Sequence, residues 1–291
     1  MTLPLVVGVD GSEASLLAVD WAVDEAARHG LSLRLVYASL WERYEGATAS
    51  TGPDRPFERA LQENIVASAA DRSERRDPDV KVSTDIIPED AADALLHEGH
   101  HAHALVTGSR GRGGAKGLLL GSVGLTVAAR AYCPVIVIRG DRAGVAGSHG
   151  RILLGAGEPV SSAAAVRFAL REAEARGCVL DVVRAWRSPT LDGLHSPGHA
   201  DLPVRRYEER ASTVLDVLLR DAMDDHPDVR VRQVTVEGPA HNRLVQRSAA
   251  ADLVIVGARR RHGQLGLQLG RVSHTLLHHA ACPVAVVPQL V

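Results

Sequence analysis

The sequence contains few cysteines and lacks the long apolar runs that membrane proteins need. Its three cysteines, Cys133, Cys178 and Cys282, are too few and too widely spaced for a disulfide framework. No apolar run reaches the roughly 18–20 residues that span a bilayer, and no basic segment followed by an apolar one opens the chain as a secretory signal would. These absences favour a soluble cytoplasmic protein.

Aromatic residues and net charge are also scarce. Phe, Trp and Tyr make up 3% of the 291 residues while apolar residues make up 45%, so the cores must consist mostly of Ala, Val, Leu and Ile. With 33 basic and 35 acidic residues, the net charge of −2 gives no global electrostatic argument for binding nucleic acid or an anionic membrane. The length fits one large domain or two ordinary ones.

What the chain does contain is an internal repeat. The segment ARAYCPVIVIRG at 129–140 returns as HAACPVAVVPQ at 279–289. Between the two copies lies GDRAGVAGSHG, residues 140–150, which is rich in Gly and small residues and has no apolar period. We therefore predict two domains, 1–140 and 150–291, with this linker between them.

Each copy alternates short apolar runs with helical patterns. In the first copy, Ser12 is placed to cap a helix whose apolar stripe runs from Leu16 to Ala26. The other elements expected in this copy are strands at 3–9, 31–38, 80–87, 104–108 and 134–139, and helices at 56–76, 91–99 and 121–131. The second copy repeats the order at 151–156, 160–176, 178–185, 202–224, 229–236, 239–249, 252–257, 270–280 and 283–287. Apolar strands that alternate with helices predict a doubly wound parallel sheet, whose ligands bind at the carboxyl ends of the strands.

The most informative stretch is LVTGSRGRGGAKGLLLGS, residues 105–122. It lacks the Walker A pattern, and no GxGxxG joins the first strand to its helix, so a P-loop and a dinucleotide fingerprint are excluded. The pattern that remains, G-x-x-G-x9-G-S, is formed by Gly108, Gly111, Gly121 and Ser122. A strand, a glycine loop and a helix N-terminus in succession make a natural phosphate cradle, because backbone N–H groups and the helix dipole face the ligand.

Each residue of this pattern has an expected role. Gly108 can leave its strand at any φ, and Gly111 lets the backbone turn close against a ligand. Gly121 removes a Cβ at the start of the helix, where Ser122 adds a hydroxyl donor beside free amides. Positive charge along the loop comes from Arg110, Arg112 and Lys116. The alternative is a disordered, glycine-rich surface loop.

The segments VVGVDGSEAS, VTGSRGRGGAKGLLLGSVG and CPVIVIR resemble the universal stress protein family, and the resemblance covers nearly the whole chain as two fused domains. It implies two tandem Rossmann-like α/β domains, each with a five-stranded parallel sheet in the order 3-2-1-4-5. It also implies that the first domain binds ATP, or ADP or AMP instead, with or without Mg²⁺. The implied ligand-binding residues are Asp10 for the adenosine portion, Val36 and Ala38 for the adenine pocket, and Gly108, Gly111, Arg112, Gly121, Ser122 and Val123 around the ribose and phosphates.

Asp10 has two interpretations. A carboxylate would repel phosphates, but it can accept a hydrogen bond from a ribose hydroxyl or an adenine amino group. Alternatively, Asp10 belongs to an Asp-Gly turn that helps to cap the following helix. The rest of the motif favours contact with the ligand.

The second copy departs from the pattern in three places. Gly157 stands at the position of Asp10, and Arg260 stands where the second loop glycine is expected. Arg271 replaces the serine. These changes weaken the case for ATP binding by this copy, whose secondary candidates are Gly257 and Gly270. An anion could still be attracted by Arg259, Arg260, Arg261 and Arg271.

Other clusters are weaker candidates. His97 and His101 in HEGHHAH could share a helical face as metal ligands, but Gly99 interrupts that helix, so a solvated junction is expected. Cys133 and Cys282 each precede a proline at a strand start, a position that is more often buried than reactive. We assign no catalytic residue and no metal ligand.

We expect a nucleotide-binding regulator of the stress response. The alternatives are a slow ATPase or phosphotransferase, since positioning and electrostatics supply much of phosphoryl transfer, and a scaffold that binds no nucleotide. The resemblance also implies that the domains pair through their last strands, Pro134–Arg139 and Pro283–Val287, and that such units form homodimers. No nucleic-acid or membrane partner is expected.

Overall fold

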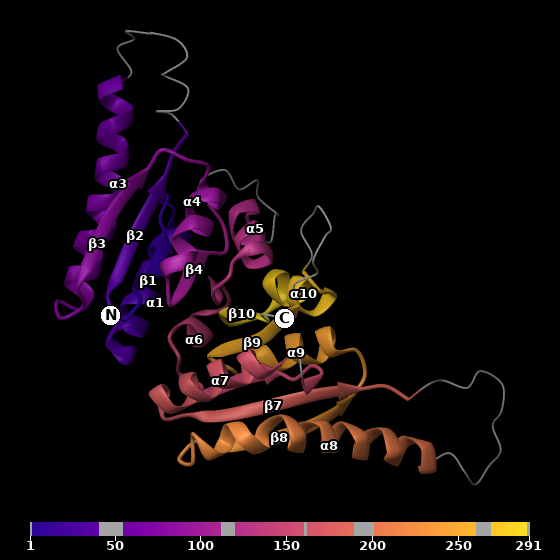
Figure 1. Ribbon diagram of the computed structural model, residues 1–291. Coiled ribbons are helices and arrows are strands. Elements are labelled where there is room, and N and C mark those ends of the chain that lie inside the picture. The colour runs from indigo at the N-terminus through magenta and orange to yellow at the C-terminus, as the bar shows by residue number, and fades with distance from the viewer. Residues whose placement is uncertain are drawn as a thin grey trace. The chain divides into compact units, whose positions relative to one another are not determined.

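The computed structural model describes residues 2–40, 55–111, 120–159, 162–188, 201–259 and 269–289. The chain separates into two compact units, of which the first holds Met1–Arg139 and the second holds Gly140–Gln264 and Gln268–Val291 (Figure 1). Among the described residues, no helix is both long enough and apolar enough to cross a membrane.

The first unit is built around a parallel sheet. Its strands are β1 (Leu5–Gly8), β2 (Leu33–Ala38), β3 (Val82–Ile87), β4 (Ala104–Gly108) and β5 (Val135–Ile138). They lie in the order β3-β2-β1-β4-β5, which confirms the order 3-2-1-4-5 expected from the sequence. Leu5 aligns with Leu33 on one side and with Ala104 on the other. The carboxyl ends of β1, β2 and β4 therefore meet at one edge of the sheet.

Helices cover both faces of this sheet, as a doubly wound fold requires. They are α1 (Glu13–His29), α3 (Arg55–Arg76), α4 (Ala91–Glu98) and α5 (Ser122–Arg130), with a short 3₁₀ turn, η1, at Gly99–His101. Helix α1 packs with α3, and α4 packs with α5. A Cβ on Gly108 would point at Ala14 at the start of α1, whereas a Cβ on Gly8 would touch Leu95 of α4. The end of β4 thus packs against α1, whereas the end of the neighbouring strand β1 packs against α4.

The cores are aliphatic, as the scarcity of aromatic residues predicts. The largest fully buried side chains are all Leu or Ile, and those of the first unit are Leu5, Leu33, Leu35, Leu105 and Ile136. Burying each of them stabilises the fold by about 1.5–3 kcal/mol relative to leaving it exposed. The strands read as continuous apolar runs because both faces of the sheet are covered.

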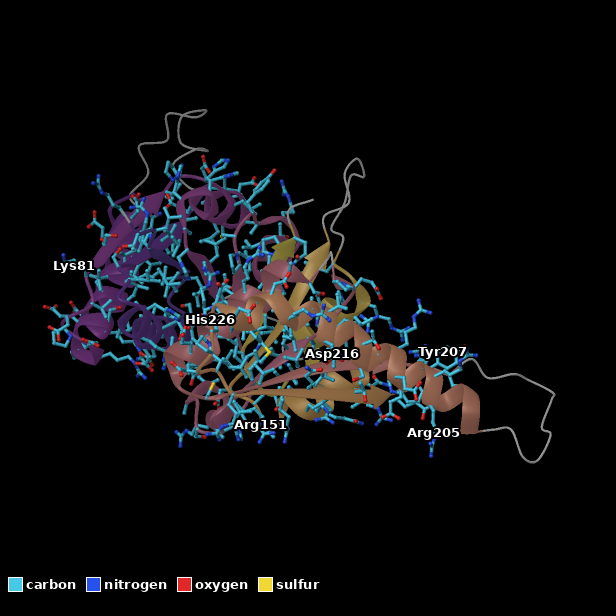
Figure 2. All side chains as sticks on the ribbon, turned by 60° about the horizontal axis from the view of Figure 1, so that its bottom comes forward. Lys81, Arg151, Arg205, Tyr207, Asp216 and His226 are labelled. Atoms are coloured by element: carbon cyan, nitrogen blue, oxygen red, sulfur yellow. The ribbon has the colours of Figure 1, made fainter. Side chains whose placement is uncertain are left out.

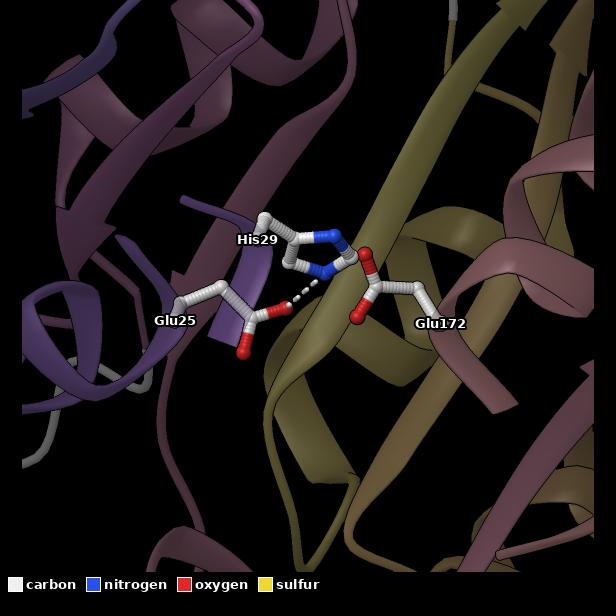
Figure 3. A group of neighbouring side chains, drawn as sticks. All are labelled: Glu25, His29 and Glu172. Atoms are coloured by element: carbon white, nitrogen blue, oxygen red, sulfur yellow. Dashed lines mark ion pairs between the residues drawn. The ribbon is translucent and has the colours of Figure 1, made fainter. Parts of the chain in front are cut away.

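Helix α1 begins and ends at residues that its sequence marks. Ser12 is the N-cap, and its side-chain oxygen accepts a hydrogen bond from Ser15 N at 3.2 Å, which confirms the predicted cap. Gly30 ends the helix in the left-handed conformation, at φ 63°. In the last turns, His29 Nε2 lies 3.3 Å from Glu25 Oε1, the ion pair drawn in Figure 3. Both ends of the helix are therefore fixed by side-chain or backbone caps.

The second unit repeats the architecture of the first. Its strands are β6 (Arg151–Gly155), β7 (Val179–Trp186), β8 (Val231–Glu237), β9 (Leu253–Arg259) and β10 (Val284–Gln289). They are parallel, in the order β8-β7-β6-β9-β10. The helices that correspond to those of the first unit are α7 (Ala163–Arg176), α8 (Asp201–Asp224), α9 (Ala240–Ser248) and α10 (Arg271–His279). The internal repeat of the sequence is thus a repeat of the fold.

Helix α8 shows how the second unit separates its apolar and polar side chains. Leu215 and Leu219 are buried, whereas Arg205 and Asp216 are exposed. Figure 2 shows Arg205, Tyr207 and Asp216 spaced along this helix. An apolar stripe on one side and charged residues on the other are typical of a helix that covers one face of a sheet.

The glycine-rich linker contains a helix that its sequence did not predict. Asp141 caps α6 (Arg142–Val145), since its carboxylate accepts a hydrogen bond from Gly144 N at 2.8 Å. Asp141 N donates to Ala281 O at 2.9 Å. A Cβ on Gly144 would lie 2.8 Å from the Cβ of Cys282. The start of the linker is therefore packed against the second unit, and glycine permits that approach.

Burial controls the chemistry of Cys133, which lies just before β5. It raises the pKa of the thiol from 9.0 to about 11. The folded state therefore disfavours the thiolate. The stabilisation that comes from keeping the thiol protonated is complete below about pH 9 and is lost as the pH rises towards 11. We expect the free energy of unfolding to fall over that interval more steeply in the wild type than in Cys133→Ala. Urea titrations at several pH values would measure both slopes, and equal slopes would contradict the assignment.

Candidate functional site

The first unit contains a cavity of about 610 Å³ at the carboxyl ends of β1, β2 and β4. This volume is within the range of about 300–1,000 Å³ that is usual for small-molecule sites. The cavity is lined by all of the predicted residues of this unit that the structure describes, namely Asp10, Val36, Ala38, Gly108, Gly111, Gly121, Ser122 and Val123. Arg112, the remaining one, lies outside the described residues. The structure therefore brings together residues that the sequence places on three strand ends and one helix start.

The turn after β1 holds the carboxylate of Asp10 in the cavity wall. Its Oδ1 atom accepts hydrogen bonds from Ser12 N at 2.9 Å and from Ser12 Oγ at 2.6 Å. Gly11 supports this turn at φ 77°, where a residue with a Cβ would be strained. The predicted Asp-Gly turn is therefore present, and the same residue lines the cavity. The two interpretations of Asp10 are compatible.

The two loop glycines are needed for space and not for an unusual φ. Positive φ values are found at other glycines, not at Gly108 or Gly111, so the expectation that Gly108 uses its freedom in φ is wrong. A Cβ on Gly108 would lie 2.6 Å from the backbone C and O atoms of Ala14. A Cβ on Gly111 would lie 2.6 Å from Asp10 Oδ2. Gly108 lets α1 approach β4, and Gly111 makes room for a carboxylate.

The start of α5 presents backbone amides to the cavity. Gly121 is the N-cap, at φ −73° and ψ 154°, with no side-chain hydrogen bond at the cap. Gly121 N donates to Ser109 O at 2.9 Å, which closes the loop at its base. The first helical bond runs from Leu125 N to Gly121 O at 3.2 Å. The amides that precede Leu125 belong to the cavity-lining residues Ser122, Val123 and Gly124. This end of the helix carries a partial positive charge and suits an anion.

Part of the cavity wall is apolar. It includes Val36 at the end of β2, which is 2% exposed, and Leu95 of α4, which is 3% exposed. Ala91, the first residue of α4, also lines it. Neither residue of α4 could be predicted from the sequence, because a helix that packs over a strand end leaves no distinctive pattern. A cavity with an apolar wall, a carboxylate and helix amides can accept a ligand that has a flat apolar part and an anionic part.

The second unit has a different arrangement at the matching strand end. Gly157 N donates to Ser162 Oγ at 3.0 Å, as Asp10 N donates to Ser15 Oγ at 3.4 Å. The second unit thus keeps the hydrogen bond from this backbone amide to a serine, but it has Gly157 in place of the aspartate. Arg184 of β7 donates instead to Gly157 O, and its other Nη atom lies 2.5 Å from Glu158 Oε1. The guanidinium group of Arg184 therefore lies at the carboxyl end of β6.

The predicted candidates of the second unit keep their places in the fold. Gly257 lies in β9, opposite Val287 of β10, and Gly270 is the N-cap of α10. Arg271 is the first residue of that helix. Burial, together with the guanidinium groups of Arg271 and Arg187, lowers the pKa of His241. Positive charge gathers where α9 and α10 begin. The structure does not describe Arg260 and Arg261, nor the side chain of Arg259.

The weaker candidates behave as expected. Helix α4, which contains His97, ends at Glu98, and His101 belongs to the 3₁₀ turn that follows. His97 Nδ1 is exposed and lies 2.9 Å from Glu89 Oε2. Cys133 and Cys282 are both buried. The histidine segment is therefore a solvated junction.

Comparison with known proteins assigns both halves of the chain to one family. The model of the universal stress protein family matches residues 1–139 and again residues 149–288. A universal stress protein of Mycobacterium tuberculosis is 34% identical, covering 98% of this chain and 97% of its own. Another from the same organism is 30% identical, covering 98% and 96%. The crystal structure of a universal stress protein from Archaeoglobus fulgidus superimposes with a TM-score of 0.69 at 17% identity, covering 99% of this chain and 98% of its own, which is a likeness of fold.

Proposed function

We propose that this chain, which belongs to the universal stress protein family, binds ATP or another adenine nucleotide in its first unit and regulates a stress response according to its nucleotide state. One observation supports this most. The residues that the sequence singled out for a nucleotide lie around one cavity of suitable size, with Asp10 and the start of α5 both in its wall.

The cavity offers a different chemistry to each part of a nucleotide. The carboxylate of Asp10 accepts hydrogen bonds and so suits a ribose hydroxyl or an adenine amino group. Val36 and Leu95 provide apolar surface for the base. The amides of Ser122 and Val123 suit phosphate oxygens. Binding with Mg²⁺ is part of this proposal, since the cation would accompany the triphosphate.

The cavity favours binding over fast hydrolysis. Among the described residues that line it, Asp10 is the one carboxylate, and its Oδ1 already accepts two hydrogen bonds from Ser12. Rapid phosphoryl transfer needs a held metal ion and a group that orients the attacking water. We therefore propose a regulator that binds its nucleotide without rapid hydrolysis, with slow hydrolysis as the second candidate function.

We propose that the second unit does not bind ATP in the same way. Gly157 lacks the carboxylate of Asp10, Arg184 covers the strand end, and Arg271 stands at the first helical position. The domain limits in this proposal are 1–140 and 150–291. Homodimerisation of the chain also stays a prediction, which sedimentation would test.

Calorimetric titration of the full chain with ATP tests the proposed function. We expect about one ATP per chain, because the second unit lacks the residues that define the first cavity. Mass spectrometry of small molecules released on denaturation would remove the ambiguity of a ligand retained during purification. Two equivalent sites would contradict the proposed difference between the units. If the titration gives no heat of binding and denaturation releases no nucleotide, the chain is better explained as a scaffold that binds no nucleotide.

A further inference from the structure

Thr107, the residue of β4 that precedes Gly108, carries a buried hydroxyl at the cavity of the first unit. The residue is 5% exposed and lines the cavity. Within the part of the chain that the structure describes, its Oγ1 atom has no hydrogen-bond partner. A buried hydroxyl without a partner destabilises a fold, so native proteins usually satisfy it. Thr107 lines the cavity while its oxygen is covered by neighbouring atoms, so a polar ligand atom would reach the hydroxyl through a small shift of those atoms.

The hydroxyl faces the region between the sheet and the first turn of α5. A Cβ added to Gly124 would lie 3.4 Å from Thr107 Oγ1 and 3.6 Å from Leu120 Cδ1. Both Gly124 and Leu120 line the cavity and are buried. Ser122, at the start of the helix, is exposed. The Thr107 hydroxyl therefore borders the dry part of the cavity, where charged phosphates would be costly and a neutral polar group would not.

The second unit shows that the fold does not need this hydroxyl. Val256 occupies the same place in β9, directly before Gly257, and is 3% exposed. Valine has the same branched shape as threonine and can fill the same space. The first unit keeps the hydroxyl where the cavity residues are intact, and the second unit lacks it where Gly157 replaces the carboxylate.

We propose that the Thr107 hydroxyl is a specificity-determining contact, which hydrogen-bonds a polar atom of the adenosine portion of the bound nucleotide. This inference rests on the proposed function. A hydroxyl can both donate and accept, so it can pair with a ring nitrogen, an amino group or a ribose oxygen. Ligand binding would then satisfy a hydroxyl that has no partner among the described residues.

The test is Thr107→Val in the full chain, with Thr107→Ser retaining the hydroxyl. We expect Thr107→Val to melt at the same temperature as the wild type or higher, because a methyl group replaces an unpaired hydroxyl. We expect its affinity for ATP and for AMP to fall by the same factor, about tenfold, because the lost contact is to adenosine. Thr107→Ser should bind nearly as the wild type does.

A matched control is Val256→Thr in the second unit. It adds a buried hydroxyl outside the first cavity, so it should lower the melting temperature and leave the ATP affinity unchanged. Unchanged affinity in Thr107→Val would overturn the proposed contact, as would a loss seen with ATP and not with AMP. A lower melting temperature in Thr107→Val would show a structural role instead. If the wild type binds no adenine nucleotide, the proposed function itself fails, and this contact fails with it.

Discussion

Gly108→Ala is expected to unfold the first unit or to destabilise it by about 3 kcal/mol or more. The added Cβ would lie 2.6 Å from Ala14 C and O and 2.9 Å from Ser15 N. These are backbone atoms of the first turn of α1, so no side-chain rotation can relieve the collision. Relief requires that α1 move away from β4, which would open the packing between these two elements, where Val19 of α1 and Val106 of β4 are fully buried.

Hydrogen exchange measured peptide by peptide would localise this effect. We expect amides of β1, β4 and α1 to lose protection while amides of β6 and β9 keep theirs, so the second unit serves as an internal reference. Gly121→Ala is the matched control, because the nearest heavy atom to its added Cβ is 3.8 Å away and its φ of −73° suits any residue. If the amides of Gly108→Ala exchange as slowly as those of the wild type, α1 can move away from β4 at little cost in stability.

The contrast between these glycines shows what a sequence motif conveys and what it does not. The spacing of Gly108, Gly111 and Gly121 predicted a strand before the motif and a helix after it, and the structure has β4 ending at Gly108 and α5 beginning at Ser122. The reason that Gly108 must be glycine was predicted wrongly. The backbone that crowds it belongs to Ala14, far away in the sequence, and local pattern does not reveal which element lies opposite.

Most of the fold could be predicted because it depends on local periodicity. Apolar runs with β-branched residues became strands, and the stripe from Leu16 to Ala26 became α1. The parts that were missed depend on tertiary contacts. Helix α6 forms where the Asp141 carboxylate accepts a hydrogen bond from Gly144 N and Asp141 N donates one to Ala281 O. Leu95 enters the cavity because α4 packs over Gly8. Thr107 was overlooked as one polar residue in an apolar strand.

The two units together indicate which features serve the fold and which serve a ligand. Both keep the serine that accepts a hydrogen bond from the backbone after the first strand, Ser15 in one and Ser162 in the other. Both keep a glycine N-cap on the helix after the loop, Gly121 and Gly270. The carboxylate of Asp10 is present in one unit alone. Features shared by the units are explained by folding, so the differences are where a function specific to the first unit should be sought.

Gly121→Asp is expected to abolish most ATP binding while the protein remains fully folded. Aspartate is a favoured N-cap, and its carboxylate would accept hydrogen bonds from backbone amides in the first turn of α5. We expect the free energy of unfolding to stay the same or to rise by roughly 0.3 kcal/mol. The same carboxylate would occupy the phosphate donors and repel the phosphates. Repulsion between charges about 4 Å apart near a protein surface is worth about 4 kcal/mol, so affinity should fall by at least about 100-fold.

The charge dependence of this loss distinguishes phosphate repulsion from a steric effect. Gly121→Asn has nearly the same shape without the charge, so we expect it to retain much more affinity for ATP than Gly121→Asp. The loss in Gly121→Asp should grow from AMP to ATP and be small for adenosine, because the added carboxylate acts on the phosphates. Gly270→Asp makes the same change at the N-cap of α10, where no heavy atom of the described residues lies within 4 Å of the added Cβ, and should leave ATP binding unchanged. If Gly121→Asp weakens adenosine as much as ATP, the start of α5 does not bind the phosphates, and the orientation of the nucleotide in the cavity must be reversed.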